Sequence, residues 1–322
     1  MMMKPIRFLA AALLAAACTS ALAQQYPSSP VKIVTAYAPG GPSDILARAV
    51  AVKLGEIWGK EVIVENRPGG AGVVGAMYVK DQPKDGHTLV IGTTTTHVIN
   101  PIAVAEAKFD AVKDFAPIAP IAGGPYVVAV HPSLGVKNIA ELIALAKRQP
   151  GRLNYGSSGT SIYLGTELFK SMAGVFMVHI PYRGGAPALN AVLANEVQVV
   201  FDPLPSTAFS HAKAGKLVLL ATTGSKRPRA APDLPTIAES GLPGYDVGSW
   251  YGVFAPGGTP RPVIDFIAAG ITKATAQPDL QEKLANLGAE TFQMSTAEFT
   301  QLVLNDQQRW KKPIADRKLT FD

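Results

Sequence analysis

The chain contains a single cysteine, Cys18, among its 322 residues. Cys18 lies in a stretch that we interpret below as a signal peptide, so the mature protein is expected to have no thiol. This absence excludes disulfides, zinc–thiolate sites and cysteine nucleophiles from the mature protein. Charged residues are also sparse, at 17%, and their scatter without a recognised motif gives no support to nucleic-acid binding. No apolar run approaches the roughly 20 residues that a membrane-spanning helix needs.

The N-terminal residues have the pattern of an export signal. Lys4 and Arg7 form a positively charged n-region, and the apolar run 8–17 follows them. The tripeptide Ala21-Leu22-Ala23 places small residues at the two positions that a signal peptidase reads. We therefore expect cleavage after Ala23 and a periplasmic mature protein.

A lipid anchor at Cys18 is the alternative for this segment. Three alanines precede Cys18 and make a poor lipobox, so cleavage after Ala23 is favoured. Without Lys4 and Arg7 the mature chain has 28 basic and 24 acidic residues, a net charge of about +4. Such a mild positive field favours an anionic ligand, although ordinary solubility accounts for it equally well.

Motifs of enzymes and metal sites are missing or incomplete. The five histidines form no H-x-x-x-H pair, so a zinc site is not expected. Gly70–Gly75 matches G-x-G-x-x-G, but Asn66-Arg67-Pro68 separates it from its strand and no acid ends the next strand. Thr160 stands where the last glycine of a G-x-S-x-G elbow belongs. The sequence thus predicts a protein without cofactor, metal or catalysis.

The length and the hydrophobic pattern predict an α/β fold with two domains. About 300 mature residues exceed what one core usually holds, and strand-like segments alternate with helical ones, which is typical of parallel βαβ units. Residues 24–123 and 248–322 are assigned to domain 1, and residues 124–247 to an inserted domain 2. The predicted elements are strands at 31–36, 61–65, 88–91, 118–130, 153–155, 177–180, 197–201, 217–222 and 248–254, and helices at 45–58, 73–79, 139–148, 162–173, 186–195, 263–276, 278–287 and 296–311.

One local design occurs three times: a strand, a short turn rich in glycine and hydroxyl residues, and a helix. The first N–H groups of a helix have no partner within the helix, and parallel strands deliver such turns to one edge of the sheet. Each turn is therefore a candidate anion site, although a plain capped turn has the same composition. The candidate ligand-binding residues are Pro39, Gly40, Gly41, Ser43 and Asp44 in the first turn, Ser157, Ser158, Thr160 and Ser161 in the second, and Tyr182, Arg183 and Gly184 in the third.

Two further places follow predicted strands. The run Thr93–Thr96 with His97 ends a strand of domain 1, so its hydroxyls are candidates for the same crevice, and Thr93, Thr94 and His97 are assigned to the site. A buried strand end whose hydroxyls bond the backbone is the other interpretation. Asp202 follows a strand of domain 2 and is a candidate acceptor for a ligand hydroxyl or amine, or a turn residue before Pro203.

Several blocks together resemble one family, the substrate-binding receptors of tripartite tricarboxylate transporters, also called Bug receptors. The resemblance covers essentially the whole mature chain. The blocks are Tyr37-Ala38-Pro39-Gly40-Gly41 with Asp44 and Ala47-Arg48, Glu65 to Gly72, Glu141-Leu142 with Ala146-Lys147, Asn154 to Gly159, Pro181-Tyr182-Arg183-Gly184, Ala214-Gly215-Lys216, Leu234-Pro235-Thr236, and Glu239-Ser240-Gly241. Arg183 is a departure, because lysine is common there in the family.

The resemblance implies a two-domain Venus-flytrap fold of the type II-like class, each domain a sheet flanked by helices. It also implies a small carboxylate ligand, either an organic acid, an amino acid or an aromatic acid, gripped by amides, hydroxyls and water from the first two turns. The expected partners are the membrane subunits of a tripartite transporter, and the protein is expected to act as a monomer. A ligand-sensing input to a signalling system is the alternative function, and a periplasmic hydrolase ranks third.

Overall fold

The structure is a computed structural model that describes residues 26–157, 159–182, 184–203, 206–228, 231–286 and 288–317. The predicted signal peptide, its cleavage site and Cys18 lie outside the described residues. Ser158 and Arg183, two candidate ligand-binding residues, also lie outside them. No helix in the described ranges is long and apolar enough to cross a membrane.

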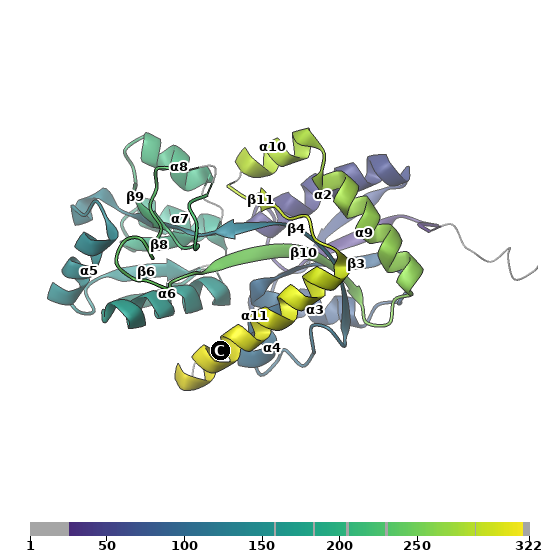
Figure 1. Ribbon diagram of the computed structural model, residues 1–322, viewed down its shortest axis with the longest axis horizontal. Coiled ribbons are helices and arrows are strands. Elements are labelled where there is room, and N and C mark those ends of the chain that lie inside the picture. The colour runs from purple at the N-terminus through teal and green to yellow at the C-terminus, as the bar shows by residue number, and fades with distance from the viewer. Residues whose placement is uncertain are drawn as a thin grey trace, which may run out of the picture.

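Two sheets organise the molecule (Figure 1). We call the six-stranded sheet and its helices lobe 1, and the five-stranded sheet and its helices lobe 2. The sheet of lobe 1 has the order β11-β4-β10-β3-β1-β2, and its strands are β1 (Val31–Thr35), β2 (Val62–Asn66), β3 (Thr88–Thr93), β4 (Phe115–Pro125), β10 (Gly248–Pro256) and β11 (Glu290–Thr291). The sheet of lobe 2 has the order β7-β6-β8-β5-β9, and its strands are β5 (Val127–Val130), β6 (Asn154–Ser157), β7 (Val178–Pro181), β8 (Val199–Asp202) and β9 (Val218–Thr222).

Helices cover both faces of each sheet, as the sequence predicted for an α/β fold (Figure 1). In lobe 1, α2, α9 and α10 lie on one face, and α3, α4 and α11 lie on the other. In lobe 2, α5 and α6 lie opposite α7 and α8. The helices are α2 (Pro42–Trp58), α3 (Val73–Lys80), α4 (Asn100–Ala103), α5 (Ile139–Arg148), α6 (Thr160–Ala173), α7 (Gly185–Leu193), α8 (Ser206–Lys213), α9 (Arg261–Thr275), α10 (Pro278–Asn286) and α11 (Thr296–Arg317), with short helices η1 (Gly70–Gly72), η2 (Thr94–Ile99, a π-helix) and η3 (Pro132–Leu134).

Helix α2 shows how the hydrophobic pattern builds lobe 1. Leu46, Val50 and Leu54 are spaced four residues apart and are fully buried in one cluster with residues of the sheet. Burying each such side chain contributes about 1.5–3 kcal/mol, which fixes the rotation of the helix on the sheet. The N-terminus of α2 is thereby held at the carboxyl end of β1, where the turn 36–41 connects them.

The G-x-G-x-x-G block serves close packing of α3. Gly72 has φ +95°, and a Cβ there would lie 2.5 Å from the Thr96 side chain. A Cβ at Gly75 would lie 2.8 Å from the Cα of Ala36, so only glycine allows α3 to approach β1 this closely. Close packing of α3 against the end of β1 therefore accounts for Gly72 and Gly75, and their presence does not require a nucleotide-binding role.

The strands differ from the predicted parallel pattern. β1 pairs in parallel with β2 and β3, and β6 pairs in parallel with β7 and β8. β10, however, runs antiparallel to β3 and β4, and β5 runs antiparallel to β8 and β9. The long strands β4 and β10 run between the two lobes in opposite directions (Figure 1), and β10, on which the chain returns to lobe 1, is the one that runs against β1, β2 and β3.

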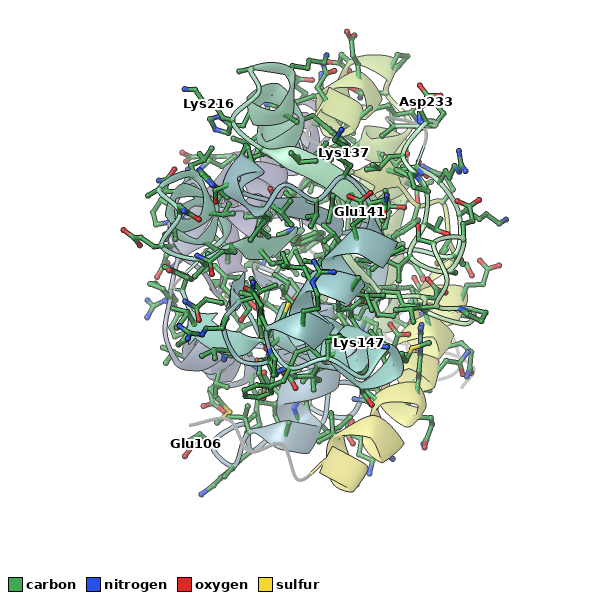
Figure 2. The ribbon with its side chains drawn as sticks, turned by 90° about the vertical axis from the view of Figure 1, so that its left-hand side faces the viewer. Glu106, Lys137, Glu141, Lys147, Lys216 and Asp233 are labelled. Atoms are coloured by element: carbon green, nitrogen blue, oxygen red, sulfur yellow. The ribbon has the colours of Figure 1, made fainter. Side chains whose placement is uncertain are left out.

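Several short elements were not predicted correctly. Residues 94–97 were expected to end a strand, but η2 begins at Thr94, because the Thr93 and Thr96 hydroxyls each accept from the other residue's backbone N–H. The sequence analysis also missed the helices α4 and α8, the short helices η1 and η3 and the two-residue strand β11. Figure 2 views the molecule from the end at lobe 2, where Lys137 and Glu141 lie close together at the start of α5.

Candidate functional site

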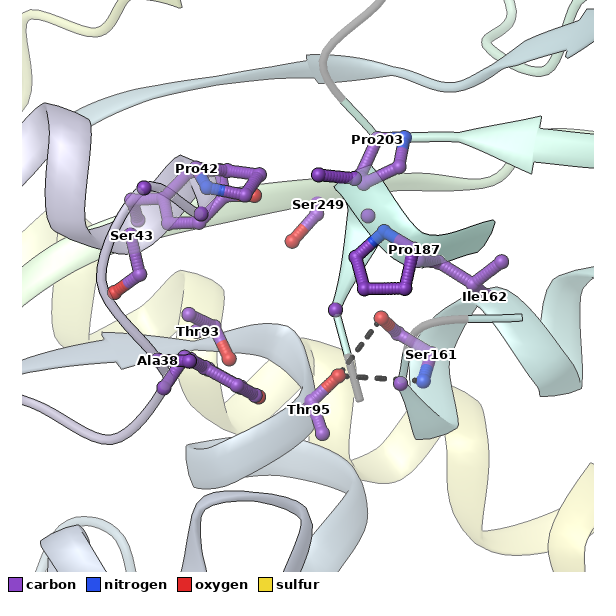
Figure 3. A pocket seen from close by; sticks show the side chains of 18 of the residues that line it. Ala38, Pro42, Ser43, Thr93, Thr95, Ser161, Ile162, Pro187, Pro203 and Ser249 are labelled. Atoms are coloured by element: carbon purple, nitrogen blue, oxygen red, sulfur yellow. Dashed lines mark hydrogen bonds between the residues drawn. The ribbon is translucent and has the colours of Figure 1, made fainter. Parts of the chain in front are cut away.

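A cavity of about 260 Å³ lies between the two lobes. Both lobes contribute to its wall, and the long strand β10 contributes Ser249 and Tyr251. Figure 3 shows Pro42 and Ser43 on one side of the cavity, Ser161 and Pro187 on the other, and Thr93 and Thr95 below. The lining residues are Tyr37, Ala38, Pro39, Gly40, Gly41, Pro42, Ser43, Thr93, Thr95, Tyr126, Gly159, Ser161, Ile162, Gly184, Gly185, Ala186, Pro187, Pro203, Ser249 and Tyr251.

Three helices begin at this cavity, and each has glycine as its N-cap residue. Gly41 precedes α2, Gly159 precedes α6 and Gly184 precedes α7, and none of the three helices has a side-chain cap. All three glycines line the cavity. The first amides of a helix carry a partial positive charge and seek an acceptor, so the three helix starts provide neutral donors for an anion.

Asp44 holds the first turn in place from behind the cavity wall. One carboxylate oxygen, Oδ2, accepts from the Gly40 amide at 3.0 Å and from Arg48 Nε at 3.1 Å. The other, Oδ1, accepts from Asn66 Nδ2 at 2.9 Å. Burial raises the pKa of Asp44, but the hydrogen bonds from Arg48, Gly40 and Asn66 outweigh this and lower the pKa below its usual value. The carboxylate is therefore ionised and already paired.

Gly40 adopts a conformation that this turn requires. Its φ is +79°, in the left-handed region that favours glycine. The Asn66 side chain also donates to the Tyr37 carbonyl at 3.1 Å, so both ends of the turn are fixed to β2. The amides on the cavity side of this turn are held in place before any ligand arrives.

Thr95 and Ser161 join the two lobes at the floor of the cavity. Their hydroxyls are 2.9 Å apart, and the Ser161 amide donates to Thr95 Oγ1 at 3.3 Å (Figure 3). Tyr126 donates from its hydroxyl to Ser161 Oγ at 3.0 Å. A ligand seated here contacts a hydroxyl network that spans both lobes.

The tyrosines of the cavity stay protonated at neutral pH. Burial raises the pKa of Tyr126 to about 12, although hydrogen bonds with Ser161 and Ser249 act in the opposite direction. Burial also raises the pKa of Tyr37, against hydrogen bonds with Thr93 and Thr95. Their hydroxyls are consequently uncharged and able to donate.

The described lining contains no acidic side chain and no lysine, arginine or histidine. The described residues also include no cluster of three or more histidine, aspartate or glutamate side chains that would hold a metal ion. Chemically, the cavity combines neutral donors with apolar walls made by proline, alanine, isoleucine and tyrosine side chains. Such a surface is suited to binding an anion through neutral hydrogen-bond donors, and its described part provides no charged side chain for acid–base chemistry.

The structure brings seven of the candidate residues into the cavity wall: Pro39, Gly40, Gly41, Ser43, Thr93, Ser161 and Gly184. Seven others are described but lie outside the lining: Asp44, Thr94, His97, Ser157, Thr160, Tyr182 and Asp202. Ser158 and Arg183 belong to neither group, since they are outside the described residues.

His97 is buried in the core of lobe 1. Its ring stacks on Phe254 with centroids 4.1 Å apart and meets the edge of Phe115 at 4.7 Å. Nδ1 lies 2.9 Å from Thr96 Oγ1, and Nε2 has no hydrogen-bond partner among the described residues. Burial lowers the pKa of His97 to about 3, so the ring is neutral and packs as an aromatic side chain.

Ser157 supports the second turn through a histidine. Its hydroxyl lies 2.7 Å from His179 Nε2, and the His179 ring lies against Tyr155 and Tyr163. Burial lowers the pKa of His179, with smaller opposing effects from Glu167 and Lys170. Ser157 itself is buried beneath the cavity wall.

The remaining candidates also have structural contacts. The Thr94 hydroxyl accepts from the Trp250 amide at 3.3 Å, and the Thr160 hydroxyl donates to Asn100 at 3.5 Å. Tyr182 packs over Gly156, where a Cβ would meet its ring at 3.2 Å. Asp202 is buried at the end of β8, next to Pro203 of the lining.

Sequence reasoning missed four important lining residues: Tyr37, Tyr126, Ser249 and Tyr251. Thr95 also lies in the lining and belongs to the run Thr93–Thr96, whose hydroxyls were expected to face the crevice. Tyr37 lies next to the first turn but was not among the candidate ligand-binding residues. Tyr126, Ser249 and Tyr251 lie in or beside the strands that connect the lobes, and a strand pattern alone does not identify these as cavity positions.

The chain is similar to known receptors over nearly its whole length. The model of the tripartite tricarboxylate transporter family receptor matches residues 46–319. A protein from the tcbD-tcbE intergenic region of Pseudomonas sp. strain P51 is 36% identical over 319 residues, which are 97% of this chain and 94% of that protein.

Two solved structures from Rhodopseudomonas palustris show the same fold. Rpa4515, solved with adipate, is 34% identical with a TM-score of 0.85, and the match covers 92% of this chain and 99% of that one. MatC, solved with bound malate, is 29% identical with a TM-score of 0.83, and the match covers 90% of this chain and all of that one.

Proposed function

Because this chain belongs to the tripartite tricarboxylate transporter family of receptors, we propose that it captures a small carboxylate for such a transporter. Receptors of this family are periplasmic solute-binding proteins. The observation that carries the carboxylate assignment is the meeting of three glycine-capped helix starts at one cavity.

Physical chemistry favours an anion at this place. Each helix start stabilises a nearby negative charge by about 0.3–1 kcal/mol at an exposed site and by up to about 2 kcal/mol when partly buried. Glycine N-caps leave first-turn amides such as those of Ser43 and Ala186 without a cap side chain as acceptor, so a carboxylate can take that role. The hydroxyls of Ser43, Thr93 and Ser161 add donors without adding charge.

The relatives support a carboxylate with two acidic ends. Rpa4515 was solved with adipate and MatC with malate, and both ligands are dicarboxylates. The ligand contacts proposed for this chain are Pro39, Gly40, Gly41, Ser43, Thr93, Ser161 and Gly184. Asp44 and Ser157 are assigned supporting roles behind the two turns.

Capture is proposed to close the lobes on the ligand. Domain 1 (24–123 and 248–322) and the inserted domain 2 (124–247) would then rotate about the strands that connect them, β4 and β10. Thr95 and Ser161 supply the contact about which the cavity narrows. The closed pair of lobes is the surface that the membrane subunits are proposed to recognise, and the receptor acts as a monomer without a cofactor.

The binding step is tested by thermal unfolding of the mature, ligand-stripped protein with a panel of carboxylates. A ligand at 100 times its dissociation constant adds about 2.7 kcal/mol to the free energy of unfolding, which raises the melting temperature by several degrees. A shift with one or more acids and no turnover of the bound acid supports capture. A panel without any shift contradicts the carboxylate assignment.

Transporter coupling is tested by uptake. Cells that lack the gene for this receptor should lose uptake of the acid identified by thermal unfolding, and the gene supplied in trans should restore it. Undiminished uptake in the deletion strain contradicts coupling and favours a sensory role instead.

A further inference from the structure

The two connections between the lobes meet at one buried threonine. Tyr126 follows β4 where the chain enters lobe 2, and Val247 precedes β10 where the chain returns to lobe 1. Thr223 of lobe 2 bonds to both of them and is fully buried. Resting on the proposed closure of the lobes, we infer that Thr223 is a positioning residue that holds the two connections together and thereby fixes where the lobes rotate. We call these bonds the Thr223 clamp.

Both the backbone and the side chain of Thr223 take part in the clamp. Its amide donates to the Tyr126 carbonyl at 3.0 Å, and its carbonyl accepts from the Val247 amide at 2.8 Å. The hydroxyl oxygen accepts from the Tyr126 amide at 2.7 Å, and the hydroxyl donates to the Val247 carbonyl at 2.6 Å, with the Tyr126 carbonyl farther away at 3.3 Å. One side chain therefore links two segments that lie far apart in the sequence.

This hydroxyl differs from those of other buried threonines. Thr166 and Thr275 donate to the carbonyls of Ile162 and Ile271, one turn earlier in their own helices, at 2.9 Å each. Such local bonds satisfy the hydroxyl without joining separate segments. The bonds of Thr223 join the chain that enters lobe 2 to the chain that leaves it, so a change there affects how the lobes are connected.

On the side of lobe 1, the returning strand β10 is held at Trp250. The Trp250 amide donates to Thr94 Oγ1 at 3.3 Å, and its indole N–H donates to Asp306 on α11 at 2.8 Å. The residues between this anchor and the clamp are Gly248 and Ser249 on β10, which pair with Pro125 and Gly124 on β4. Rotation of one lobe on the other is thus confined to a short paired segment, which is typical of hinges.

The two connections touch each other within this segment. A Cβ at Gly248 would lie 3.0 Å from the Gly124 carbonyl oxygen, and a Cβ at Gly224, the residue after Thr223, would lie 3.0 Å from Pro125 Cβ. The backbones are too close for either one to bend while the other stays in place. The clamp and the close packing therefore make the two strands move as one hinge.

The clamp also reaches the cavity through Tyr126. Thr223 is not among the lining residues, but Tyr126 is. The backbone of Tyr126 is held by Thr223, and its hydroxyl donates to Ser161 Oγ at 3.0 Å. Loss of the Thr223 hydroxyl should consequently loosen both the angle between the lobes and one wall of the cavity.

The test measures distances between the lobes in the ligand-free protein. The chain has no cysteine after Cys18, so spin labels can be attached to Val52→Cys on α2 and Lys147→Cys on α5, two exposed positions in different lobes. Thr223→Val keeps the shape of the side chain but leaves the Tyr126 amide without its hydroxyl acceptor. Double electron–electron resonance should show a distance distribution at least about twofold wider than in the labelled protein with Thr223.

The neighbouring residue supplies a matched control. Thr222 is also fully buried, and its hydroxyl has no hydrogen-bond partner in the part of the chain that the structure describes. Thr222→Val should therefore leave the width of the distribution unchanged. Thr223→Ser, which keeps the hydroxyl, should restore the narrow distribution.

Three results overturn the inference: an unchanged width in Thr223→Val, equal widening in Thr222→Val, or a wide distribution in Thr223→Ser. If Thr223→Val does not fold, hydrogen exchange of the unsubstituted protein decides. The Tyr126 and Val247 amides should exchange at least about 100-fold more slowly than in an unfolded chain, and exchange near the unfolded rate overturns the clamp.

These measurements need no ligand, so they separate the clamp from the proposed function. If no acid raises the melting temperature while the distributions behave as expected, the proposed function fails and the clamp stands. If an acid binds and Thr223→Val keeps the narrow distribution, the proposed function stands and the clamp is overturned.

Discussion

The three helices that begin at the cavity differ at their N-termini from two helices that begin away from it, α5 and α11. Away from the cavity, Asn138 caps α5 by accepting from the Glu141 amide at 2.9 Å, and Glu141 accepts from the Lys137 amide at 2.7 Å. Ser295 and Glu298 form a similar reciprocal cap on α11. At the cavity, α2, α6 and α7 have glycine in the same position and no side-chain cap.

The difference indicates that this fold keeps helix N-termini without side-chain caps where a ligand is proposed to bind. A side-chain cap in place of glycine stabilises a helix by a few tenths of a kcal/mol, so the cavity helices give up a little stability. First-turn amides such as those of Ser43 and Ala186 consequently remain available to a ligand.

Adding an acidic cap at the cavity should abolish binding. Gly41 has φ −80° and ψ 168°, which any N-cap residue adopts, and a Cβ there meets only the Ala38 carbonyl oxygen at 3.4 Å. Gly41→Asp should keep or slightly raise the free energy of unfolding, while its charge lowers carboxylate affinity about 1,000-fold, the equivalent of about 4 kcal/mol at close range. Calorimetric titration and urea unfolding measure the two quantities.

The matched control for this variant is Asn138→Asp on α5, which adds the same charge at a helix start far from the cavity. It should leave carboxylate affinity unchanged. Retained binding in Gly41→Asp, or equal losses in both variants, contradicts the distinction between cavity helices and capped helices.

Acid should destabilise the capped helix η2 through His97. The folded-state pKa of His97 is lowered from 6.5 to about 3 by burial, so its contribution to stability is present above pH 6.5 and is lost as the pH falls toward 3. Between pH 7 and pH 4 the loss is about 3 kcal/mol. Urea unfolding across this range should show a much flatter profile in His97→Asn.

His211→Asn on α8 is the control, and its profile should follow that of the unsubstituted protein. If His97→Asn shows the same loss with acid as the unsubstituted protein, the titration of His97 is not the cause.

Weakening the brace behind the first turn should affect binding and stability together. Asp44→Asn removes the ion pair with Arg48 and leaves one acceptor oxygen for Gly40, Arg48 and Asn66, which donate to two oxygens of Asp44. We expect the free energy of unfolding to fall by about 2 kcal/mol, and carboxylate affinity to fall about tenfold or more because the amides of the turn lose their fixed direction. Asp279→Asn, which disrupts an exposed pair with Lys53, should change neither quantity measurably. Unchanged affinity in Asp44→Asn would show that the bonds of Asp44 do not position the first turn for binding.

The smallest effect concerns the contact between the lobes. Thr95→Val and Ser161→Ala each remove one hydroxyl of the pair that is 2.9 Å apart. In a double-mutant cycle on carboxylate affinity the two changes should couple by about 1 kcal/mol. Strict additivity would mean that the two hydroxyls do not act together in holding the ligand.

Much of this organisation follows from local pattern. The spacing of apolar residues predicted α5 with its observed bounds, 139–148. Glycine and hydroxyl turns after strands predicted candidate anion-binding residues, and of these Gly40, Gly41 and Ser43 line the cavity. Their contact with an anion stays a prediction. Signals of this kind lie within a few residues of the group that they position.

Contacts across the fold were beyond such reasoning. Tyr126 and Tyr251 reach the cavity only because β4 and β10 connect the lobes, and the sequence pattern of a strand does not indicate which of its side chains meets a distant wall. Asp44 was expected to contact the ligand, yet the structure places it outside the lining and pairs it with Arg48 and Asn66. A helix N-terminus without a side-chain cap does not by itself indicate a binding site. The structure indicates one because three such N-termini lie at the same cavity.

The most direct test of this account is an amide NMR titration of the ligand-stripped protein with the acid that raises its melting temperature most. The amide resonances of Ser43 at the start of α2 and of Ala186 at the start of α7 should move as the acid binds, since these first-turn groups line the cavity. The resonance of Glu141, whose amide is already bonded to Asn138, should stay in place. Saturable binding that leaves Ser43 and Ala186 unmoved would contradict the claim that glycine-capped helix starts hold the carboxylate.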